Sequence, residues 1–156
     1  MESSGTHCFQ IHGVALECDG LGILILGESC SGKSTAALDL LSRGYRLIAD
    51  DAVLLCVNGK GELVAKPHEF VRGLINTRES GTITAQYMFG SESTLNEALI
   101  GLCFELTGLN YSAGAFPAGR SRVRLAGVEI PVYEVRISRN GGAAEYIEAV
   151  VNEHLL

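Results

Sequence analysis

No apolar run in this sequence of 156 residues approaches the roughly 18 residues that a membrane-spanning helix needs. The first ten residues, MESSGTHCFQ, contain neither the basic segment nor the apolar segment of a secretory signal peptide. We therefore predict a cytoplasmic protein that does not engage a membrane.

The sequence also lacks any Cys-x-x-Cys pair, although it contains five cysteines. They are widely spaced, at Cys8, Cys18, Cys30, Cys56 and Cys103. This spacing disfavours a zinc site and a thioredoxin-like redox motif. We predict reduced thiols, as is usual for proteins in the cytoplasm.

An excess of positive charge is missing as well. The chain has 12 Lys and Arg against 18 Asp and Glu, for a formal net charge of −6. This balance disfavours nucleic acid as an unaided partner, because phosphate backbones attract concentrated basic residues. A local basic group suits a small anionic ligand better, and it comprises Arg120, Arg122, Arg124, Arg136 and Arg139.

Internal repeats and low-complexity linkers are absent too, so residues 1–156 are predicted to form one domain. Hydrophobic residues make up 47% of the chain and charged residues 19%, which is typical of a folded domain. We predict an α/β fold in which strands outnumber helices, so that the sheet is mixed and contains antiparallel hairpins.

The expected elements follow from apolar patterns and turn residues. Asp19-Gly20 and the NGKG stretch at 58–61 are typical hairpin turns, and Ala126-Gly127 marks a third. Residues 98–106 form a buried strand or a buried helix, which periodicity alone cannot decide. The remaining predictions are strands at 8–18 and 20–27, a helix at 33–44 ending at Gly44, strands on either side of the acidic pair within 46–57, and an amphipathic helix within 141–156.

The stretch GESCSGKST has the G-x-x-x-x-G-K-[ST] spacing of a phosphate-binding loop between a strand and a helix. Glycines allow the close approach of backbone N–H groups to phosphate, and the helix N-terminus adds partial positive charge. Lys33 is expected to reach the β- and γ-phosphates, Ser34 to bind Mg²⁺, and Thr35 to face the helix surface. The predicted nucleotide-binding residues are Gly27, Glu28, Ser29, Cys30, Ser31, Gly32, Lys33, Ser34 and Thr35.

Two acidic residues, Asp50 and Asp51, follow one helix later. A carboxylate near the attacking hydroxyl can accept its proton, although the pair could also be a solvated turn. His12 lies in the strand before the loop. It is either an ordinary hydrogen-bonded strand residue or a group that orients an acid near the phosphate.

IHGVAL, GESCSGKST and RLIADDAVLL, in this order, resemble the catalytic, C-terminal domain of the HPr kinase/phosphorylase family. RGLINTRESGTITAQYMFG and LAGVEIPVYEVRISRN are similar to two further segments of that family. The resemblance implies a P-loop kinase domain related to phosphoenolpyruvate carboxykinase, in a short form without the family's N-terminal domain. It also implies ATP with Mg²⁺, a serine of the phosphocarrier HPr as acceptor, reversal by phosphorolysis, and a hexamer.

The resemblance further implies roles for individual residues. Asp50 would be the base that activates the substrate serine, with Asp51 and His12 supporting metal and phosphate. Arg78 and Arg136 would neutralise charge on the transferring group. The metal ligands would be Ser34, Asp51 and Asn76.

The chain departs from the family at one of these positions and at one further position, which leaves alternative functions open. Asn76 stands where the family has Glu, and Glu79 where it has Gly. The altered segment could serve a different protein, a peptide or a small hydroxyl compound. Loss of the charged metal ligand would instead fit a nucleotide-binding module with little transfer activity.

Overall fold

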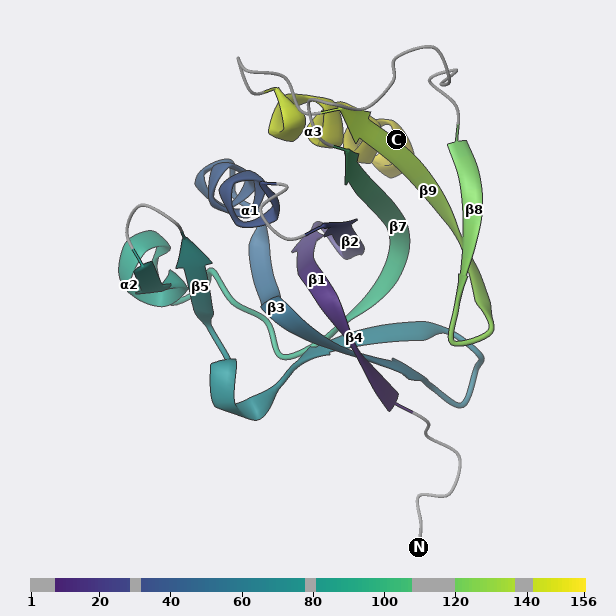
Figure 1. Cartoon of the computed structure of the whole chain (residues 1–156), viewed down its shortest axis with the longest axis horizontal. Coiled ribbons are helices and arrows are strands. Elements are labelled where there is room, and N and C mark those ends of the chain that lie inside the picture. The colour runs from purple at the N-terminus through teal and green to yellow at the C-terminus, as the bar shows by residue number, and fades with distance from the viewer. Residues whose placement is uncertain (1–7, 29–31, 78–80, 108–119, 137–141) are drawn as a thin grey trace, which may run out of the picture.

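The computed structural model describes residues 8–28, 32–77, 81–107, 120–136 and 142–156 (Figure 1). Several residues named above lie outside this part of the chain, so the predictions made for them are not addressed by the structure. They are Ser29, Cys30, Ser31, Arg78, Glu79 and Arg139.

The chain begins with the predicted hairpin of β1 (Cys8–Cys18) and β2 (Leu21–Gly27). Asp19 and Gly20 both have positive φ, as a tight two-residue turn requires. Helix α1 (Lys33–Ser42) follows and buries Ala36, Ala37, Leu40 and Leu41. It ends where predicted, because Gly44 has a φ of 98° and its amide donates to the carbonyl of Leu41.

Strand β3 (Arg46–Val57) corrects the prediction of two strands flanking the acidic pair. It runs without a break because its pairing with β1 continues through both acids, with Val14 opposite Asp50 and Gly13 opposite Asp51. Within the acidic pair only Asp51 has an unusual backbone, with a φ of 73°, and the register with β1 shifts further along, between Ala15 and Leu16. The predicted hairpin then leads into β4 (Leu63–Pro67).

The ambiguous segment at 98–106 is a strand, β7 (Ala98–Thr107). It is buried because β2 and β9 pair along its two edges and β4 pairs with its first two residues. The hairpin of β8 (Arg120–Leu125) and β9 (Val128–Arg136) and the final helix α3 (Ala143–Leu155) form as predicted.

The main sheet has the strand order β2-β1-β3-β4-β7-β9-β8 and an additional pairing between β2 and β7. That pairing closes five strands into a ring. The β2–β7 and β7–β9 pairs are parallel and the others antiparallel, so the predicted mixed sheet is confirmed. Because β2, β7 and β9 run in one direction, their carboxyl ends meet at one edge of the sheet.

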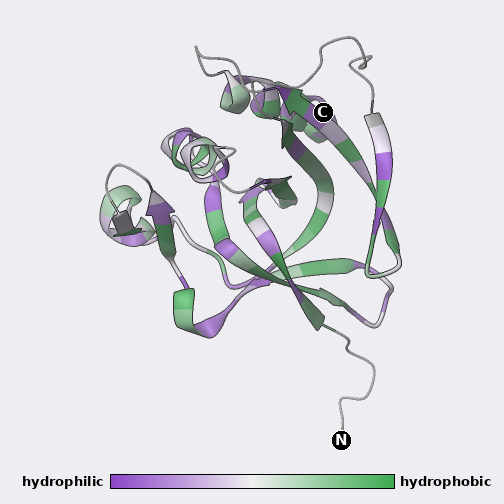
Figure 2. Cartoon of the chain, viewed as in Figure 1, coloured by the Kyte–Doolittle hydropathy of each residue, from purple (hydrophilic) through white to green (hydrophobic). Residues whose placement is uncertain are grey.

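Alternating residues of these strands build two apolar clusters. One contains only strand residues, among them Ala15, Leu24, Val53 and Cys103. The other lies between the sheet and helices α1 and α3, which sit side by side in Figure 1. Figure 2 shows the hydrophobic residues concentrated along the curved strands. The sheet is thus a rigid frame for the residues at its carboxyl-end edge.

A smaller unit extends from the main sheet. It consists of the short helix η1 (Glu69–Val71), the paired strands β5 (Leu74–Thr77) and β6 (Gly81–Thr84), and helix α2 (Ala85–Phe89). Buried Ile75 and Ala85 join it to the cluster under α1. The unit brings β5 against β3 beside the acidic pair.

The structure contradicts the prediction of reduced thiols for two cysteines. Cys8 and Cys56 form a disulfide, because the antiparallel register of β1 and β3 places them opposite each other with a Cα–Cα distance of 4.1 Å. Their sequence separation of 48 residues conceals this proximity. Cys18 and Cys103 are free, and burial raises the pKa of the Cys103 thiol to about 12. Among the described residues, no helix has both the length and the apolar character to cross a bilayer.

Candidate active site

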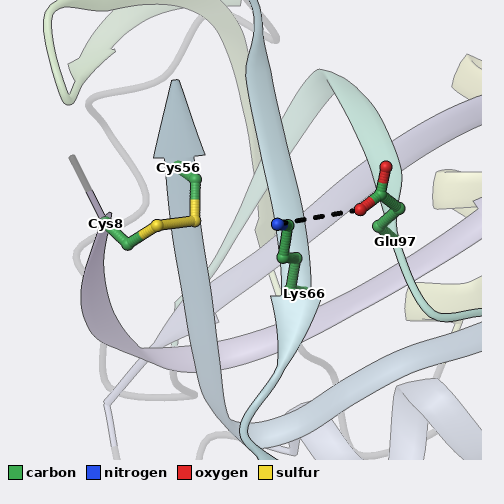
Figure 3. The surroundings of a disulfide bond; sticks show 4 residues. All are labelled: Cys8, Cys56, Lys66 and Glu97. Carbon is green, nitrogen blue, oxygen red and sulfur yellow. Dashed lines mark ion pairs between the residues drawn. A yellow bond between two sulfur atoms is a disulfide. The ribbon is translucent and has the colours of Figure 1, made fainter. Parts of the chain in front are cut away.

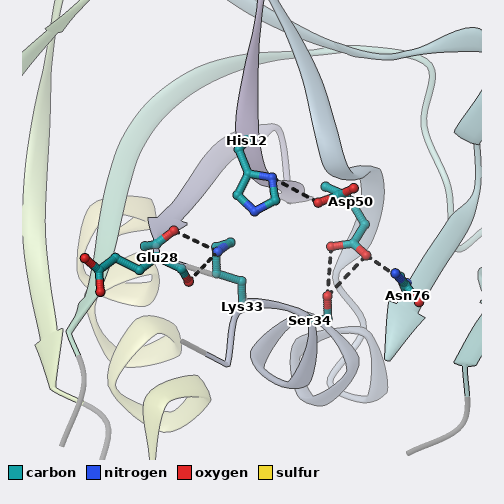
Figure 4. Close-up of polar contacts among 8 residues, drawn as sticks. His12, Glu28, Lys33, Ser34, Asp50 and Asn76 are labelled. Atoms are coloured by element: carbon teal, nitrogen blue, oxygen red, sulfur yellow. Dashed lines mark hydrogen bonds and ion pairs between the residues drawn. The ribbon is translucent and has the colours of Figure 1, made fainter. Parts of the chain in front are cut away.

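The phosphate-binding loop leads from the carboxyl end of β2 to the first turn of α1. Gly32 caps the helix with a φ of 99°, which glycine adopts without a steric penalty. Lys33 is only 7% exposed, and its ammonium group donates to the carbonyls of Gly27 at 2.7 Å and Glu28 at 2.9 Å. The loop's own carbonyls therefore hold the positive charge within the loop (Figure 4).

Asp50 lies beside Ser34, the second residue of α1. The Ser34 hydroxyl donates to its carboxylate at 3.1 and 3.2 Å, and the backbone amide of Asn76 donates to it at 2.9 Å. Asp50 is 3% exposed, and this burial raises the pKa of its carboxyl group. The hydrogen bonds from Asn76 and Ser34 act against this effect, because they lower the pKa of the Asp50 carboxyl group. Two oxygen-bearing side chains thus meet at the start of α1.

Asp51 has a different neighbour. Its carboxylate is 3.0 Å from Nδ1 of His12, and the two side chains are 62% and 53% exposed. The left-handed backbone at Asp51 accompanies the divergence of the two acids, one towards Ser34 and the other towards His12. In Figure 4, Lys33 and Ser34 lie at the start of α1 and His12 lies across from them on β1. Asp51 therefore faces solvent, whereas Asp50 faces the loop.

The structure brings together five of the residues singled out from the sequence, namely His12, Lys33, Ser34, Asp50 and Asp51. Asn76 joins them through its backbone amide, and its side chain is exposed. Thr35 is exposed, as predicted. Arg136 ends β9 opposite Thr107, at the same edge of the sheet as the loop.

Sequence reasoning missed two features of this edge. Gly13 pairs with Asp51, and a Cβ there would lie 2.9 Å from the carbonyl oxygen of Ile25, so this glycine lets β1 pass close under the strand that leads into the loop. Glu134 lies opposite Glu105, and burial and Glu105 both raise its pKa, while Arg136 lowers it. Only the strand register reveals either feature.

The described residues contain no group of three His, Cys, Asp or Glu side chains that could hold a metal. Ser34 and Asp50 offer the hard oxygen donors that Mg²⁺ prefers. This ion commonly completes its shell with water and substrate phosphates. The donor set therefore fits Mg²⁺ bound together with a nucleotide and does not form a complete protein cage.

The chain is similar to known proteins over most of its length. The profile of the family described as HPr Serine kinase C-terminal domain matches residues 5–156. The chain is 31% identical over 149 residues to HPr kinase/phosphorylase of Prosthecochloris aestuarii, covering 94% of this chain and 44% of that protein. It is equally identical over 149 residues to the enzyme of the same name from Streptococcus uberis, covering 93% of this chain and 47% of that protein. The chain thus spans less than half the length of these relatives.

A solved structure shares the fold. The HPr(Ser) kinase/phosphatase of Coxiella burnetii superposes with a TM-score of 0.83 at 25% identity, covering 94% of this chain and 90% of that chain. The predicted P-loop kinase fold with a mixed sheet is therefore confirmed.

Proposed function

The chain belongs to the family of HPr serine kinase C-terminal domains, and on this premise we propose that it transfers the γ-phosphoryl group of ATP to a serine hydroxyl of HPr or a related phosphocarrier. One observation carries the proposal. The adjacent acids Asp50 and Asp51 contact different groups, Ser34 of the phosphate-binding loop and His12 on the solvent side. A phosphoryl-transfer site needs both a nucleotide side and an acceptor side.

The nucleotide side consists of the loop and the start of α1. Lys33 exchanges its bonds to the Gly27 and Glu28 carbonyls for bonds to phosphate oxygens. The backbone amides at the helix N-terminus add favourable partial charge. Lys33 thereby holds the phosphate chain and stabilises negative charge as the γ-phosphoryl group leaves.

Ser34 and Asp50 hold the metal in this proposal. Their oxygens already lie 3.1 to 3.2 Å apart, and the Asn76 amide fixes the carboxylate from the other side. Bound Mg²⁺ would offset charge on the β- and γ-phosphates. Asn76 was predicted to bind the metal with its side chain, but its backbone bond to Asp50 favours an indirect, orienting contribution.

Asp51 acts as the base, which exchanges the roles that the family resemblance implied for the two acids. Its carboxylate accepts the proton of the serine hydroxyl as the serine oxygen attacks the γ-phosphorus, and ADP departs. His12 orients that carboxylate from 3.0 Å. The exposure of Asp51 supports this assignment because the hydroxyl of a protein acceptor must reach the base.

Arginines supply the remaining positive charge. Arg136 ends β9 at the sheet edge that also carries the loop, so a transferring phosphoryl group would be within its field. Arg78, which lies outside the described residues, follows Thr77 at the end of β5 and receives the same role by family resemblance.

The finer features of the family complete the proposal. We place the reaction in the cytoplasm, where ATP is available, and assign the chain to a homo-oligomer of the family's hexameric type. Tyr146 and Leu155 on α3 are each 37% exposed, and such apolar residues support a subunit contact. Light scattering of the purified chain would test the assembly, and a monomer at every concentration would contradict it.

The proposal is tested by incubating the purified chain with HPr, Mg²⁺ and ATP labelled in the γ-phosphate. We expect label on a serine of HPr, and none when EDTA removes Mg²⁺ or when that serine is replaced by alanine. Saturable ATP binding without phosphorylated HPr would contradict the proposal. Labelling of another protein in a cell extract would then identify a different acceptor.

A further inference from the structure

We propose that the Cys8–Cys56 disulfide is a redox-controlled positioning site, at which thiol–disulfide exchange with a dithiol determines how firmly His12 is held against Asp51. The inference rests on the proposed function, because it makes phosphoryl transfer depend on the oxidation state of this pair. The chemical class of its reaction partner is a small dithiol or a protein with a reactive dithiol.

The disulfide lies on the same two strands as the acceptor side of the site. Cys8 begins β1, and Cys56 is the penultimate residue of β3. The register runs without interruption from Cys8 opposite Cys56 to His12 opposite Ala52 and Gly13 opposite Asp51. The covalent link therefore closes the far end of the short ladder that holds His12 beside Asp51.

The two strands differ in how firmly the rest of the sheet holds them. At this end β3 is an inner strand, because β4 pairs with it from Val53 to Val57. Lys66 on β4 forms an ion pair with Glu97, with 3.8 Å between Nζ and Oε1. Figure 3 shows this pair next to the disulfide. We expect β3 to keep its pairing with β4 whether or not the disulfide is present.

β1 has no such second neighbour at this end. Its pairing with β2 begins only at Val14, so within the described part of the chain residues 8–13 pair with β3 alone. Cys8 and the two residues after it are exposed. Such an edge segment frays more readily than an inner strand, because few buried contacts hold it.

Reduction of the disulfide would therefore loosen β1 and leave β3 in place. His12 is carried by the loosened segment, and its contact with Asp51 is exposed to competing water. Lys33 and Asp50 are buried at the loop and lie outside this segment. The expected consequence is slower transfer with unchanged affinity for ATP.

The chemistry balances without a metal or a cofactor. A thiolate of the dithiol attacks the sulfur of the exposed Cys8, the S–S bond breaks, and Cys56 leaves as a thiolate that takes up a proton. The second thiol of the reductant then displaces Cys8. The protein gains two thiols and the reductant becomes a disulfide, so two electrons are transferred.

The test compares the oxidised chain with the chain reduced by dithiothreitol, using thiol titration, amide hydrogen exchange and transfer to HPr. We expect two additional thiols after reduction, faster exchange at residues 9–12, and a kcat lowered by about tenfold with unchanged KM for ATP. The double variant Cys8→Ser/Cys56→Ser should have the hydrogen exchange and kcat of the reduced chain, and adding the reductant should change neither. Cys18→Ser, on the same strand beyond the site, should respond as the wild type does.

Three results would overturn the inference. They are an oxidised preparation in which Cys8 and Cys56 titrate as thiols, exchange at residues 9–12 that does not respond to reduction, and equal kcat in both states. Absence of transfer in both states would instead overturn the proposed function. The exchange comparison would then still decide whether the disulfide holds β1.

Discussion

The two sides of the site differ in how completely the fold itself organises them. On the nucleotide side Lys33 is 7% exposed and Asp50 3%, and both are held by bonds of the folded chain. On the acceptor side the side chains of His12 and Asp51 are 53% and 62% exposed and pair mainly with each other. The fold thus holds the groups of one side in place and leaves the groups of the other side open to solvent.

The backbone conformation also differs between the nucleotide side and the acceptor side. The loop bends at glycines, where positive φ costs little, whereas Asp51 takes a φ of 73° with a side chain in place. Strain of this kind persists where the surroundings enforce it and function uses it. The left-handed backbone at Asp51 therefore lowers the stability of the fold relative to an ordinary extended residue.

A large effect is expected at the nucleotide side. Lys33→Ala removes the ammonium group that the loop holds, and transfer should fall by at least about 100-fold because charge on the phosphates is no longer neutralised. Lys60→Ala, at an exposed turn position, is the matched control and should transfer normally. The transfer rates of both variants are measured with labelled ATP. A wild-type rate for Lys33→Ala would mean that the lysine of the loop takes no part in transfer.

A smaller effect is expected at His12, which acts through Asp51. His12→Ala should lower kcat by about tenfold and leave KM for ATP unchanged, because the nucleotide side does not contact it. His154→Gln at the end of α3 serves as the control. A rise in KM for ATP with constant kcat would place His12 on the nucleotide side and contradict the division of the site into two sides.

The buried carboxylate of Asp50 should lower stability at neutral pH when Mg²⁺ is absent. Its pKa is raised from 3.8 by burial, so its contribution to stability is fully present below 3.8 and is lost as pH rises through the folded-state value. Asp50→Asn should therefore melt at a higher temperature than wild type near pH 7, with a smaller difference near pH 4. Thermal unfolding in EDTA measures this. A difference that grows on acidification would reverse the assigned direction of the shift.

The smallest effect concerns the backbone of Asp51. Asp51→Gly should be more stable than Asp51→Ala by about 1 kcal/mol, because both lose the carboxylate and only glycine tolerates the left-handed conformation freely. Urea unfolding of the two variants isolates the backbone contribution. Equal stabilities would mean that the backbone at position 51 leaves the left-handed conformation in the Asp51→Ala variant.

Much of the nucleotide side could be predicted from the sequence, because the loop, its lysine and its serine are contiguous and their chemistry is local. The hairpins at Asp19-Gly20 and Ala126-Gly127 were predictable for the same reason. The contacts of Asp50 and Asp51 were not, since their partners lie on three distant elements, with Ser34 on α1, Asn76 on β5 and His12 on β1. An extended strand accounts for two acids pointing apart, but not for which acid meets Ser34.

The disulfide and the role of Gly13 were equally beyond the sequence. Cys8 and Cys56 become neighbours only through the register of β1 with β3, and Gly13 matters only because Ile25 passes close above it. The segment at 98–106 became a strand because neighbours occupy both of its edges, which apolar periodicity cannot reveal. These features depend on contacts between distant parts of the chain.

The central claim is that the adjacent acids serve opposite sides of the site, and the paired variants Asp50→Asn and Asp51→Asn test it most directly. ATP affinity, with and without Mg²⁺, and the rate of transfer to HPr should be measured for both. Asp51→Asn should bind Mg²⁺ and ATP as the wild type does and transfer about 100-fold to 10,000-fold more slowly. Asp50→Asn should lose the gain in affinity that Mg²⁺ provides. Wild-type transfer by Asp51→Asn, together with intact Mg²⁺-dependent binding by an inactive Asp50→Asn, would contradict the claim.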